Sequence, residues 1–334
     1  MIAVKKEGVL LRNTDLSFEN ESVLNPAVIK EGDFIHLFYR AVHIRNYSSI
    51  GYCKLNNPLT VIERKDAPLL SPEYDYESHG MEDPRIVEID GLYYLTYIAF
   101  DGTNALGALA TSTDLLQFER RGIIVPKITY NDFDRYTKNN TKLNEKYLRY
   151  NRGANILADK DLVFFPRRIN GKLTFLHRIK PDIQITTVNN LEDLTNEFWV
   201  DYFMHFKKHI FLAPKYAHEV SYVGSGCPPI ETEHGWLVIY HGVKDMIKGY
   251  EYSCCVALME LTNPTIEIAR LPYPLFKPEL NYELNGDVDD VCFPTGTVII
   301  DDKLYIYYGA ADELIACASV SLSGLLNELL LNRV

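Results

Sequence analysis

One strand pattern recurs five times along this chain. Each copy opens on a turn pair and continues as alternating aromatic and aliphatic residues, which predicts a strand that begins at a hairpin turn. The turn pairs are Glu31-Gly32, Asp90-Gly91, Asn170-Gly171, His234-Gly235 and Asp301-Asp302. Successive copies are 59, 80, 64 and 67 residues apart, by subtraction between the anchors Gly32, Gly91, Gly171, Gly235 and Asp302. Five repeats of about sixty residues predict an all-β fold, a five-bladed β-propeller of four-stranded blades.

The segments between and after these copies complete the predicted architecture. A single catalytic domain over residues 1–334 is expected, interrupted by a polar, asparagine-rich and partly helix-compatible insertion around residues 127–150. Such insertions are usually surface loops, and some are lids or oligomer contacts. The apolar spacing of residues 321–331 predicts a short C-terminal helix that packs against the outer strands.

Composition excludes several classes of partner. The 334 residues carry a formal net charge of -11, so a general attraction to nucleic acid or to anionic membranes is not expected, and an anionic ligand must be held locally. The N-terminus has no long apolar region, and no stretch reaches the roughly 18 apolar residues of a membrane span. A soluble, cytoplasmic protein with no membrane association is therefore expected. Its oligomeric state is left open, a homo-oligomer included.

No sequence motif indicates a cofactor or a metal. The six cysteines are scattered without the paired spacing of a zinc site, which favours small buried thiols. The chain has no Gly-rich phosphate loop, Ser-centred elbow or HExxH motif, which argues against nucleotide, triad and zincin chemistry. Its carboxylates form no dense oxygen cluster of the kind that binds hard cations. Neither a metal nor an organic cofactor is expected.

The run Gly80-Met81-Glu82-Asp83-Pro84-Arg85 predicts a catalytic acid. Pro84 restricts the residue before it, so Asp83 is expected to be extended, with its carboxylate aimed by the backbone. Glu82 should point to the other side of the segment and orient Asp83 or bind a hydroxyl. The alternative is a turn in which Arg85 pairs with a neighbouring carboxylate and no chemistry follows.

Three of the repeated strands end on a cationic or imidazole residue that suits a shared pocket, and the other two end a little before an aspartate. These residues are Arg40, Asp101, His177 with Arg178, His241 and Asp312. In a propeller they are expected to converge on one central funnel; otherwise they decorate five separate loops. Such a funnel suits cleavage of a glycosidic bond, which needs an acid for the departing oxygen and an attacking group on the opposite face of the sugar.

Several short segments resemble glycoside hydrolase family 130. They are MEDPR at 81–85, FYRA at 38–41, GSGCPPIET at 224–232, GWLVIYHGV at 235–243, FPTG at 293–296 and YGAAD at 308–312. The matches run from about Asn25 to Asp312, nearly the whole chain. The resemblance implies a five-bladed β-propeller that acts on β-mannosides. Most members would be inverting phosphorylases that form mannose 1-phosphate, and a smaller group would hydrolyse β-1,2-mannosides.

The resemblance also implies roles for individual residues. Asp83 matches the proton donor, which acts through a sugar hydroxyl in this family. The residues expected at the sugar are Asn25, Arg40 and Asp312, joined by Glu82, Arg85 and Asp101 from the patterns above. The residues expected at the phosphate or water are Arg178, His241 and Tyr252, joined by His177 and by Tyr222. At Tyr222 the chain departs from the family, because many phosphorylases have a lysine there.

That departure bears on which group attacks the sugar. A phosphate dianion requires several cations, so loss of the lysine weakens the phosphate site. A nearby glutamate would repel phosphate and serve as a base for water, which makes Glu219 the candidate base and Glu251 the second choice. Inverting hydrolysis of β-1,2-linked manno-oligosaccharides is therefore expected, with phosphorolysis, and inorganic phosphate as co-substrate, as the alternative. A third hypothesis is a carbohydrate-binding propeller without catalytic activity.

Overall fold

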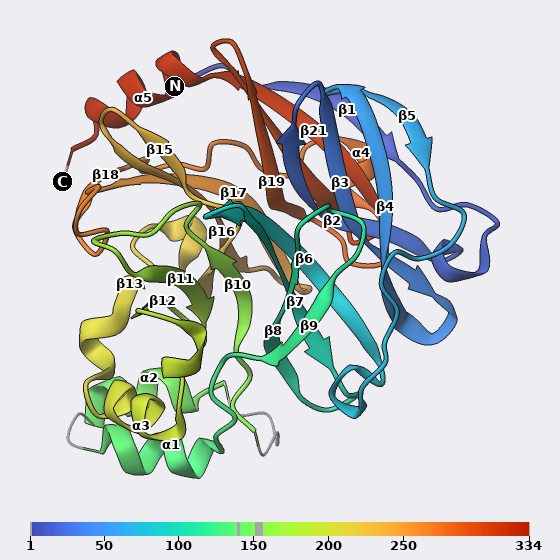
Figure 1. Cartoon of the computed structure of the whole chain (residues 1–334). Helices are drawn as coiled ribbons and strands as arrows, with labels where there is room; N and C mark the ends of the chain where they lie inside the picture. Colours follow the sequence, from blue (N-terminus) through green and yellow to red (C-terminus); the bar gives the residue numbers. More distant parts are fainter. Residues whose placement is uncertain (1, 139–140, 151–155, 334) are drawn as a thin grey trace.

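The chain is an all-β protein with few helices (Figure 1). The computed structural model describes residues 2–138, 141–150 and 156–333. Hairpin turns carry the positive backbone angles that the turn pairs predict. In Asp90-Gly91 the two φ angles are 53° and 79°, and in Asn170-Gly171 they are 50° and 77°. Asn, Asp and Gly adopt this left-handed conformation most readily, so these pairs set the register of their hairpins.

The described strands form four sheets, antiparallel apart from one parallel bridge. The largest contains β2 (Ser22–Glu31), β3 (Phe34–His43), β4 (Tyr47–Asn57), β5 (Thr60–Arg64), β6 (Gly80–Ile89), β7 (Leu92–Phe100), β8 (Ala105–Ser112) and β9 (Glu119–Ile123). The second contains β10 (Lys160–Phe164), β11 (Leu173–Arg178), β12 (Ile183–Val188) and β13 (Ile210–Leu212). The third contains β14 (Tyr222–Ser225), β15 (Ile230–Thr232), β16 (Gly235–Asp245), β17 (Tyr250–Met259) and β18 (Glu267–Arg270). The fourth contains β19 (Cys292–Ile300), β20 (Lys303–Ala310), β21 (Leu314–Ser321) and β1 (Lys5–Leu11).

The five copies of the sequence pattern are the strands β3, β7, β11, β16 and β20. The eight-stranded sheet holds two of the repeats, β2 to β5 and β6 to β9, joined only by the parallel bridge between Ser48 and Gly80. The structure thus has four sheets where the pattern predicts five, because the backbones meet at this glycine. The first strands of the repeats also lie together: β6 contacts β2 and β10, β10 contacts β14, and β19 contacts β2.

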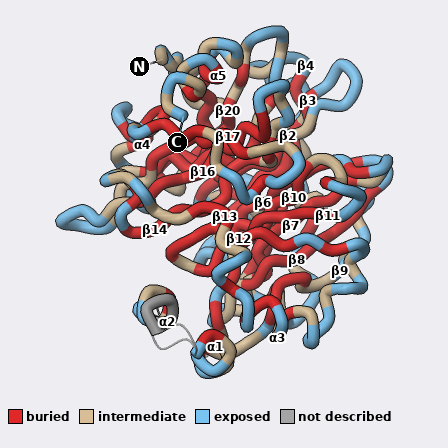
Figure 2. Tube along the Cα trace, turned by 90° about the vertical axis from the view of Figure 1, so that its left-hand side faces the viewer, coloured by how far each residue is buried: buried red, intermediate tan, exposed pale blue. Residues whose placement is uncertain are grey.

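The core consists of five apolar clusters in the described chain, each between two consecutive strand repeats. Leu37 of β3 and Tyr307 of β20, for example, share the cluster that joins the first repeat to the last. Buried residues accordingly run along the strands, while exposed residues gather at loops and helix surfaces (Figure 2). All six cysteines are buried and free, as expected.

The helices lie outside these sheets. They are α1 (Tyr130–Thr137), α2 (Thr141–Leu148), α3 (Asn196–Met204), α4 (Asn281–Leu284) and α5 (Leu322–Leu330). Helices α1 and α2 form the predicted insertion, and α1 begins at a capping box between Thr129 and Asp132. Helices α1, α2 and α3 lie together at one end of the molecule, while α5, the predicted C-terminal helix, lies near both termini (Figure 1). None of the described helices has the length and apolar character needed to cross a membrane.

Five buried carboxylates repeat along the chain with the strands. They are Glu19, Glu77, Asp159, Glu219 and Glu283, each fully buried. Their spacings are 58, 82, 60 and 64 residues by subtraction, close to those of the turn pairs. The three in the short 3₁₀ turns end η1 (Ser17–Glu19), η3 (Asp75–Glu77) and η6 (Ala217–Glu219). The remaining 3₁₀ turns are η2 (Ile44–Asn46), η4 (Leu191–Asp193) and η5 (Phe206–His209).

Each carboxylate accepts a hydrogen bond from a tyrosine hydroxyl or a histidine ring nitrogen on the second strand of its repeat. The donors are Tyr39, Tyr97, His177, Tyr240 and Tyr308. Four of the five carboxylates also pair with a cation on the outermost strand: Arg64, Arg120, Arg270 and Lys6. A buried charge is stable only when it is paired and hydrogen-bonded, so each network fixes the segment before the first strand to the second strand, and in four repeats also to the outermost strand.

Glu219 belongs to this set, which corrects its expected role as a base. Its carboxylate accepts hydrogen bonds from the Tyr240 hydroxyl and from the backbone of Lys215 at 2.8 Å, and it lies 3.3 Å from Arg270. With no exposed surface, it has no access to an attacking water. The position of Glu219 shortly before Tyr222 is therefore explained by its structural role in the strand repeat and not by catalysis.

We predict that Glu219→Gln lowers the free energy of unfolding by about 3 kcal/mol, since it removes the charge that compensates buried Arg270. Urea denaturation measures this, with Glu233→Gln, whose carboxylate is 84% exposed, as the control that should leave stability unchanged. Folded Glu219→Gln should keep the catalytic activity of the wild type. A stable but inactive variant would restore the residue as a catalytic candidate.

Candidate active site

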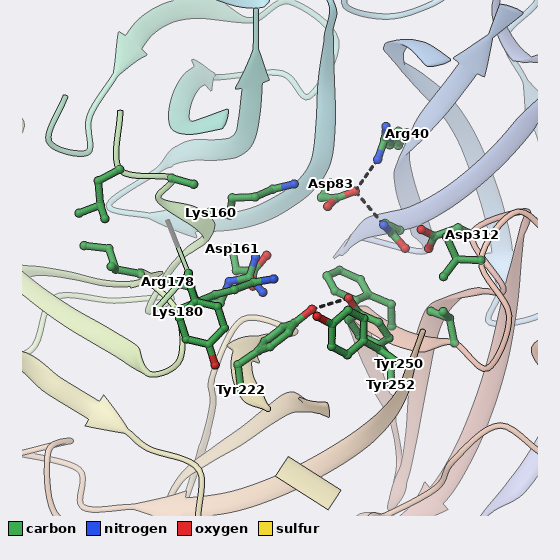
Figure 3. A pocket seen from close by; sticks show the side chains of 18 of the residues that line it. Arg40, Asp83, Lys160, Asp161, Arg178, Lys180, Tyr222, Tyr250, Tyr252 and Asp312 are labelled. Atoms are coloured by element: carbon green, nitrogen blue, oxygen red, sulfur yellow. Dashed lines mark hydrogen bonds and ion pairs between the residues drawn. The ribbon is translucent and has the colours of Figure 1, made fainter. Parts of the chain in front are cut away.

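A single pocket of about 410 Å³ gathers seven of the fourteen residues expected at the site (Figure 3). This volume is within the range of about 300–1,000 Å³ typical of small-molecule sites. Its charged lining residues are Arg40, Asp83, Lys160, Asp161, Arg178, Lys180 and Asp312. Its aromatic lining residues are Tyr130, Tyr147, Tyr150, Tyr222, Tyr250, Tyr252 and Phe293. The pocket therefore combines charges with ring surfaces, as sugar-binding sites require.

Bulges in the first strands of three repeats direct three polar side chains into the pocket. Pairing in β2 skips between Leu24 and Ala27, and pairing in β6 skips between Glu82 and Arg85. The residues in these gaps, Asn25 and Asp83, have φ angles of 49° and 47°.

Asp83 is thus left-handed and not extended, which corrects the expectation drawn from Pro84. Asp161 of β10 repeats the arrangement with a φ of 53°. Bulges of this kind redirect side chains beside active sites, and Asn and Asp tolerate the conformation.

Asp83 is held in a network of opposite charges. Its Oδ1 accepts a hydrogen bond of 2.7 Å from the Asn25 amide and lies 3.6 Å from Arg40 Nη1. Glu82 lies behind, where it pairs with Arg40 at 2.9 Å and with Lys160 at 3.1 Å. Burial opposes ionisation of Asp83, but the charges of Arg40, Lys160 and Arg85 outweigh it and lower its pKa. Glu82 is outside the pocket lining and positions these cations.

Asp312 has the opposite electrostatic environment. Burial and the neighbouring Asp83 charge raise its pKa from 3.8 to about 6, against the opposing effects of Arg40 and Lys160. Two carboxylates in one pocket resist simultaneous ionisation, so below about pH 6 the pair retains one proton, on Asp312. Asp312 and Arg40 are brought to Asp83, as the sequence predicts.

Away from Arg40 and Asp83 the pocket carries Arg178, Lys180 and Tyr222, with Tyr250 and Tyr252 between Tyr222 and Asp312 (Figure 3). Arg178 Nε lies 2.9 Å from Asp161 Oδ2, and its guanidinium carbon lies 5.2 Å from the centre of the Tyr222 ring. The Tyr222 and Tyr252 hydroxyl groups bond to each other. Burial raises the pKa of both phenols, so they remain protonated and able to donate hydrogen bonds to an anion.

His241 lies behind this side of the pocket. Its side chain is fully buried, packs against Phe293 with the ring centres 4.4 Å apart and the ring planes tilted by 33°, and has Nε2 3.6 Å from Asp161. Burial and the charges of Arg178, Arg85 and Lys180 hold its pKa well below the ordinary range. The imidazole is therefore neutral and adds no positive charge for an anion, unlike the role expected for it.

The remaining residues expected at the site lie elsewhere. Arg85 is buried beneath the pocket, where it donates to the carbonyl oxygens of Gly226, Asp83 and Ser225. His177 faces away and contacts Asp159 and Tyr202. Asp101 caps a turn through the amides of residues 103 and 104, and Glu251 pairs with Lys244 on the neighbouring strand at 2.8 Å.

Three charged pocket residues were not predicted from the sequence: Lys160, Asp161 and Lys180. A signal for Asp161 was available, because Asn25, Asp83 and Asp161 are 58 and 78 residues apart by subtraction, matching the strand repeat. The insertion also contributes Tyr130, Tyr147 and Tyr150 to the lining. These tyrosines carry no sequence signature, since only their neighbours in space make them part of a site.

One group among the described residues has the composition of a metal site, namely His218, Glu219 and Cys255. Glu219 already pairs with Arg270, whose positive charge opposes a cation at the same carboxylate. The group therefore fits a packed structural network better than a metal centre.

Facing acids and cations among aromatic rings, in a pocket of an all-β protein, are the groups that an enzyme acting on glycosides requires. The chain belongs to glycoside hydrolase family 130: the family model described as beta-1,4-mannooligosaccharide phosphorylase matches residues 7–330.

Individual relatives agree with this assignment. A 1,2-beta-oligomannan phosphorylase of Thermoanaerobacter sp. (strain X514) is 32% identical over 331 residues, which cover 95% of this chain and 97% of the relative. A beta-1,2-mannobiose phosphorylase of the same organism is 35% identical over 319 residues, 91% of each chain. The solved structure of beta-1,2-mannobiose phosphorylase from Listeria innocua has the same fold, with a TM-score of 0.76 at 21% identity over 99% of this chain and 100% of that one.

The raised pKa of Asp312 predicts a pH-dependent stability. Because the folded-state pKa exceeds the unfolded value, the contribution of Asp312 to stability is full below about pH 4 and is lost as the pH rises through about 6. Asp312→Asn should therefore raise the free energy of unfolding at pH 8 by about 3 kcal/mol, and by little at pH 4.

Urea denaturation of wild type and variant at both values measures the difference, with exposed Asp33→Asn as the control. Equal gains at pH 4 and pH 8 would show that Asp312 does not titrate between them.

Proposed function

We propose that this protein cleaves β-mannosidic bonds of manno-oligosaccharides by phosphorolysis, with inversion and release of mannose 1-phosphate. The observation that carries the proposal is the pocket's division into an Asp83 side and an Arg178 side. The named relatives support it: they are phosphorylases of 1,2-β-oligomannan and of β-1,2-mannobiose. A β-1,2-linked manno-oligosaccharide is the proposed substrate, and inorganic phosphate the co-substrate.

In this mechanism Asp83 supplies the proton that the leaving oxygen takes up as the C1–O bond breaks. A sugar hydroxyl relays the proton, and the resulting carboxylate is stabilised by Arg40 and by the Asn25 amide. Without ligands, and below about pH 6, the proton of the pair resides on Asp312. A phosphate dianion adds negative charge to the pocket and raises the proton affinity of Asp83, which favours the protonated acid in the loaded site.

The attacking phosphate binds on the Arg178 side. One phosphate oxygen forms the new bond to C1 from the face opposite the leaving group, while the guanidinium and the Tyr222 and Tyr252 hydroxyls bind the other oxygens. Asp161 fixes the orientation of Arg178 at 2.9 Å.

Hydrolysis, the reaction expected from the sequence, has lost its main support. It rested on the missing lysine at Tyr222 and on Glu219, with Glu251 as second choice, as a base for water. Glu219 is buried in a structural network, and Glu251 pairs with Lys244. Among the described lining residues the acids are Asp83, Asp161 and Asp312, and the one on the attacking side, Asp161, is paired with Arg178. A hydrolase would need a free base on that side of the sugar.

The architecture we propose is a single-domain, five-bladed β-propeller with the pocket at its axis. Five strand repeats, five intervening apolar clusters and the mutual contacts of first strands support it. Pairing of β1 with the C-terminal strand β21 would close the ring of blades.

Product analysis tests the proposed reaction. Incubated with β-1,2-mannobiose, the protein should form mannose 1-phosphate only when inorganic phosphate is present, because phosphate is the nucleophile. Ion chromatography of the products measures both sugars, and boiled protein is the control. Free mannose formed at the same rate with and without phosphate would instead identify a hydrolase.

Asp83→Asn should lower the rate of cleavage by about 10²–10⁴-fold, the usual contribution of a general acid. Initial rates with saturating phosphate measure the loss, and Asp101→Asn, which alters a turn outside the pocket, should retain wild-type rates. Full activity of Asp83→Asn on every manno-oligosaccharide would remove Asp83 from the mechanism. An inactive wild type that still binds the sugar would indicate a carbohydrate-binding protein.

A further inference from the structure

Lys180 lies on the attacking side of the pocket, two residues after Arg178. Its ammonium group lies 3.7 Å from the centre of the Tyr222 ring, on which Arg178 also packs. Two cations thus share one aromatic ring, at the residue where this chain departs from the lysine of many phosphorylases. A cation over an aromatic face gains electrostatic attraction and loses freedom of movement, so the ring fixes the lysine near Arg178.

The backbone around Lys180 is held in place by buried polar groups. Gln184 accepts from the Ile179 amide at 2.6 Å and donates to the carbonyl oxygens of Ile179 and Asp182. The Pro181 carbonyl accepts from the amide of Val223 at 2.9 Å, which ties this turn to β14. The turn that contains Lys180 is therefore a rigid part of the pocket lining.

The helical insertion anchors the same turn. Asp182 is fully buried, and its carboxylate accepts from Lys146 at 2.5 Å and 2.7 Å and from the Tyr147 hydroxyl. Because Lys146 and Tyr147 belong to α2, the insertion determines where residue 180 stands relative to the pocket. A preorganised cation binds an anion more tightly, since little freedom is lost on binding.

Resting on the proposed phosphorolysis, we infer that Lys180 is the second cation of the phosphate site, beside Arg178 on the Tyr222 ring. Arg40 and Lys160 pair with Glu82 next to Asp83, whereas Lys180 lines the pocket beside Arg178 on the shared Tyr222 ring. His241 adds no charge. A phosphate dianion bound by Arg178 is thus also contacted by the positively charged Lys180. The Tyr222 ring aligns both cations.

The test separates binding of phosphate from binding of sugar. Lys180→Met should raise the KM for inorganic phosphate by about 10- to 100-fold, the loss expected for one charge-assisted contact. The KM for β-1,2-mannobiose should stay at the wild-type value. Lys180→Arg should recover part of the phosphate affinity, because the charge is retained. A matched control is Lys54→Met, since the Lys54 ammonium lies 3.9 Å from the Phe34 ring outside the pocket.

A second measurement does not depend on turnover. Inorganic phosphate should raise the thermal midpoint of the wild type and of Lys54→Met, and this rise should be lost in Lys180→Met. A wild-type phosphate KM or a wild-type thermal shift in Lys180→Met would overturn the assignment while leaving phosphorolysis intact. If no mannose 1-phosphate forms but Lys180→Met abolishes a phosphate-induced shift, the proposed reaction fails and the site stands. If the wild type shows neither mannose 1-phosphate nor a phosphate-induced shift, both fail.

Discussion

Burial of five carboxylates is the constraint on which the rest of this structure depends. Each lies beyond the reach of water, so each requires a hydrogen-bond donor, and a phenol or imidazole on the second strand of its repeat meets that requirement. The cations Arg64, Arg120, Arg270 and Lys6 then bring the outermost strands into the same networks. Acids in this fold therefore divide into those that hold strands together and those that face the ligand.

The polar side chains that face the ligand are placed by a different local feature, a bulge in the first strand of a repeat. Asn25, Asp83 and Asp161 occupy irregular positions of first strands, each with a positive φ. A regular strand would alternate its side chains between two sheet faces, whereas a bulge turns a polar group toward the strand end. Because the first strands of the repeats lie beside one another, the same device repeated in neighbouring strands collects polar groups in one pocket.

The two sides of the pocket differ in their charge and in which of their groups hold a proton. Around Asp83 the cations Arg40 and Lys160 favour the carboxylate, while the proton moves to the more weakly compensated Asp312. Around Arg178 the phenols stay protonated and His241 stays neutral, so the guanidinium and Lys180 carry the positive charge. Such a division suits a reaction in which one side donates a proton and the other binds an anion.

The sequence by itself determined the periodic features: the hairpin turns at Asp90-Gly91 and Asn170-Gly171, the five repeated strands, the C-terminal helix and the run containing Asp83. These depend on local backbone preferences and on side-chain alternation, which short segments carry within themselves. Only the tertiary structure decided that Glu219 and His177 are structural, that Arg85 lies beneath the pocket, and that Lys160, Asp161 and Lys180 line it. The physical reason is that the role of a charged group depends on its burial and on its partners, and here those partners come from strands tens to hundreds of residues away.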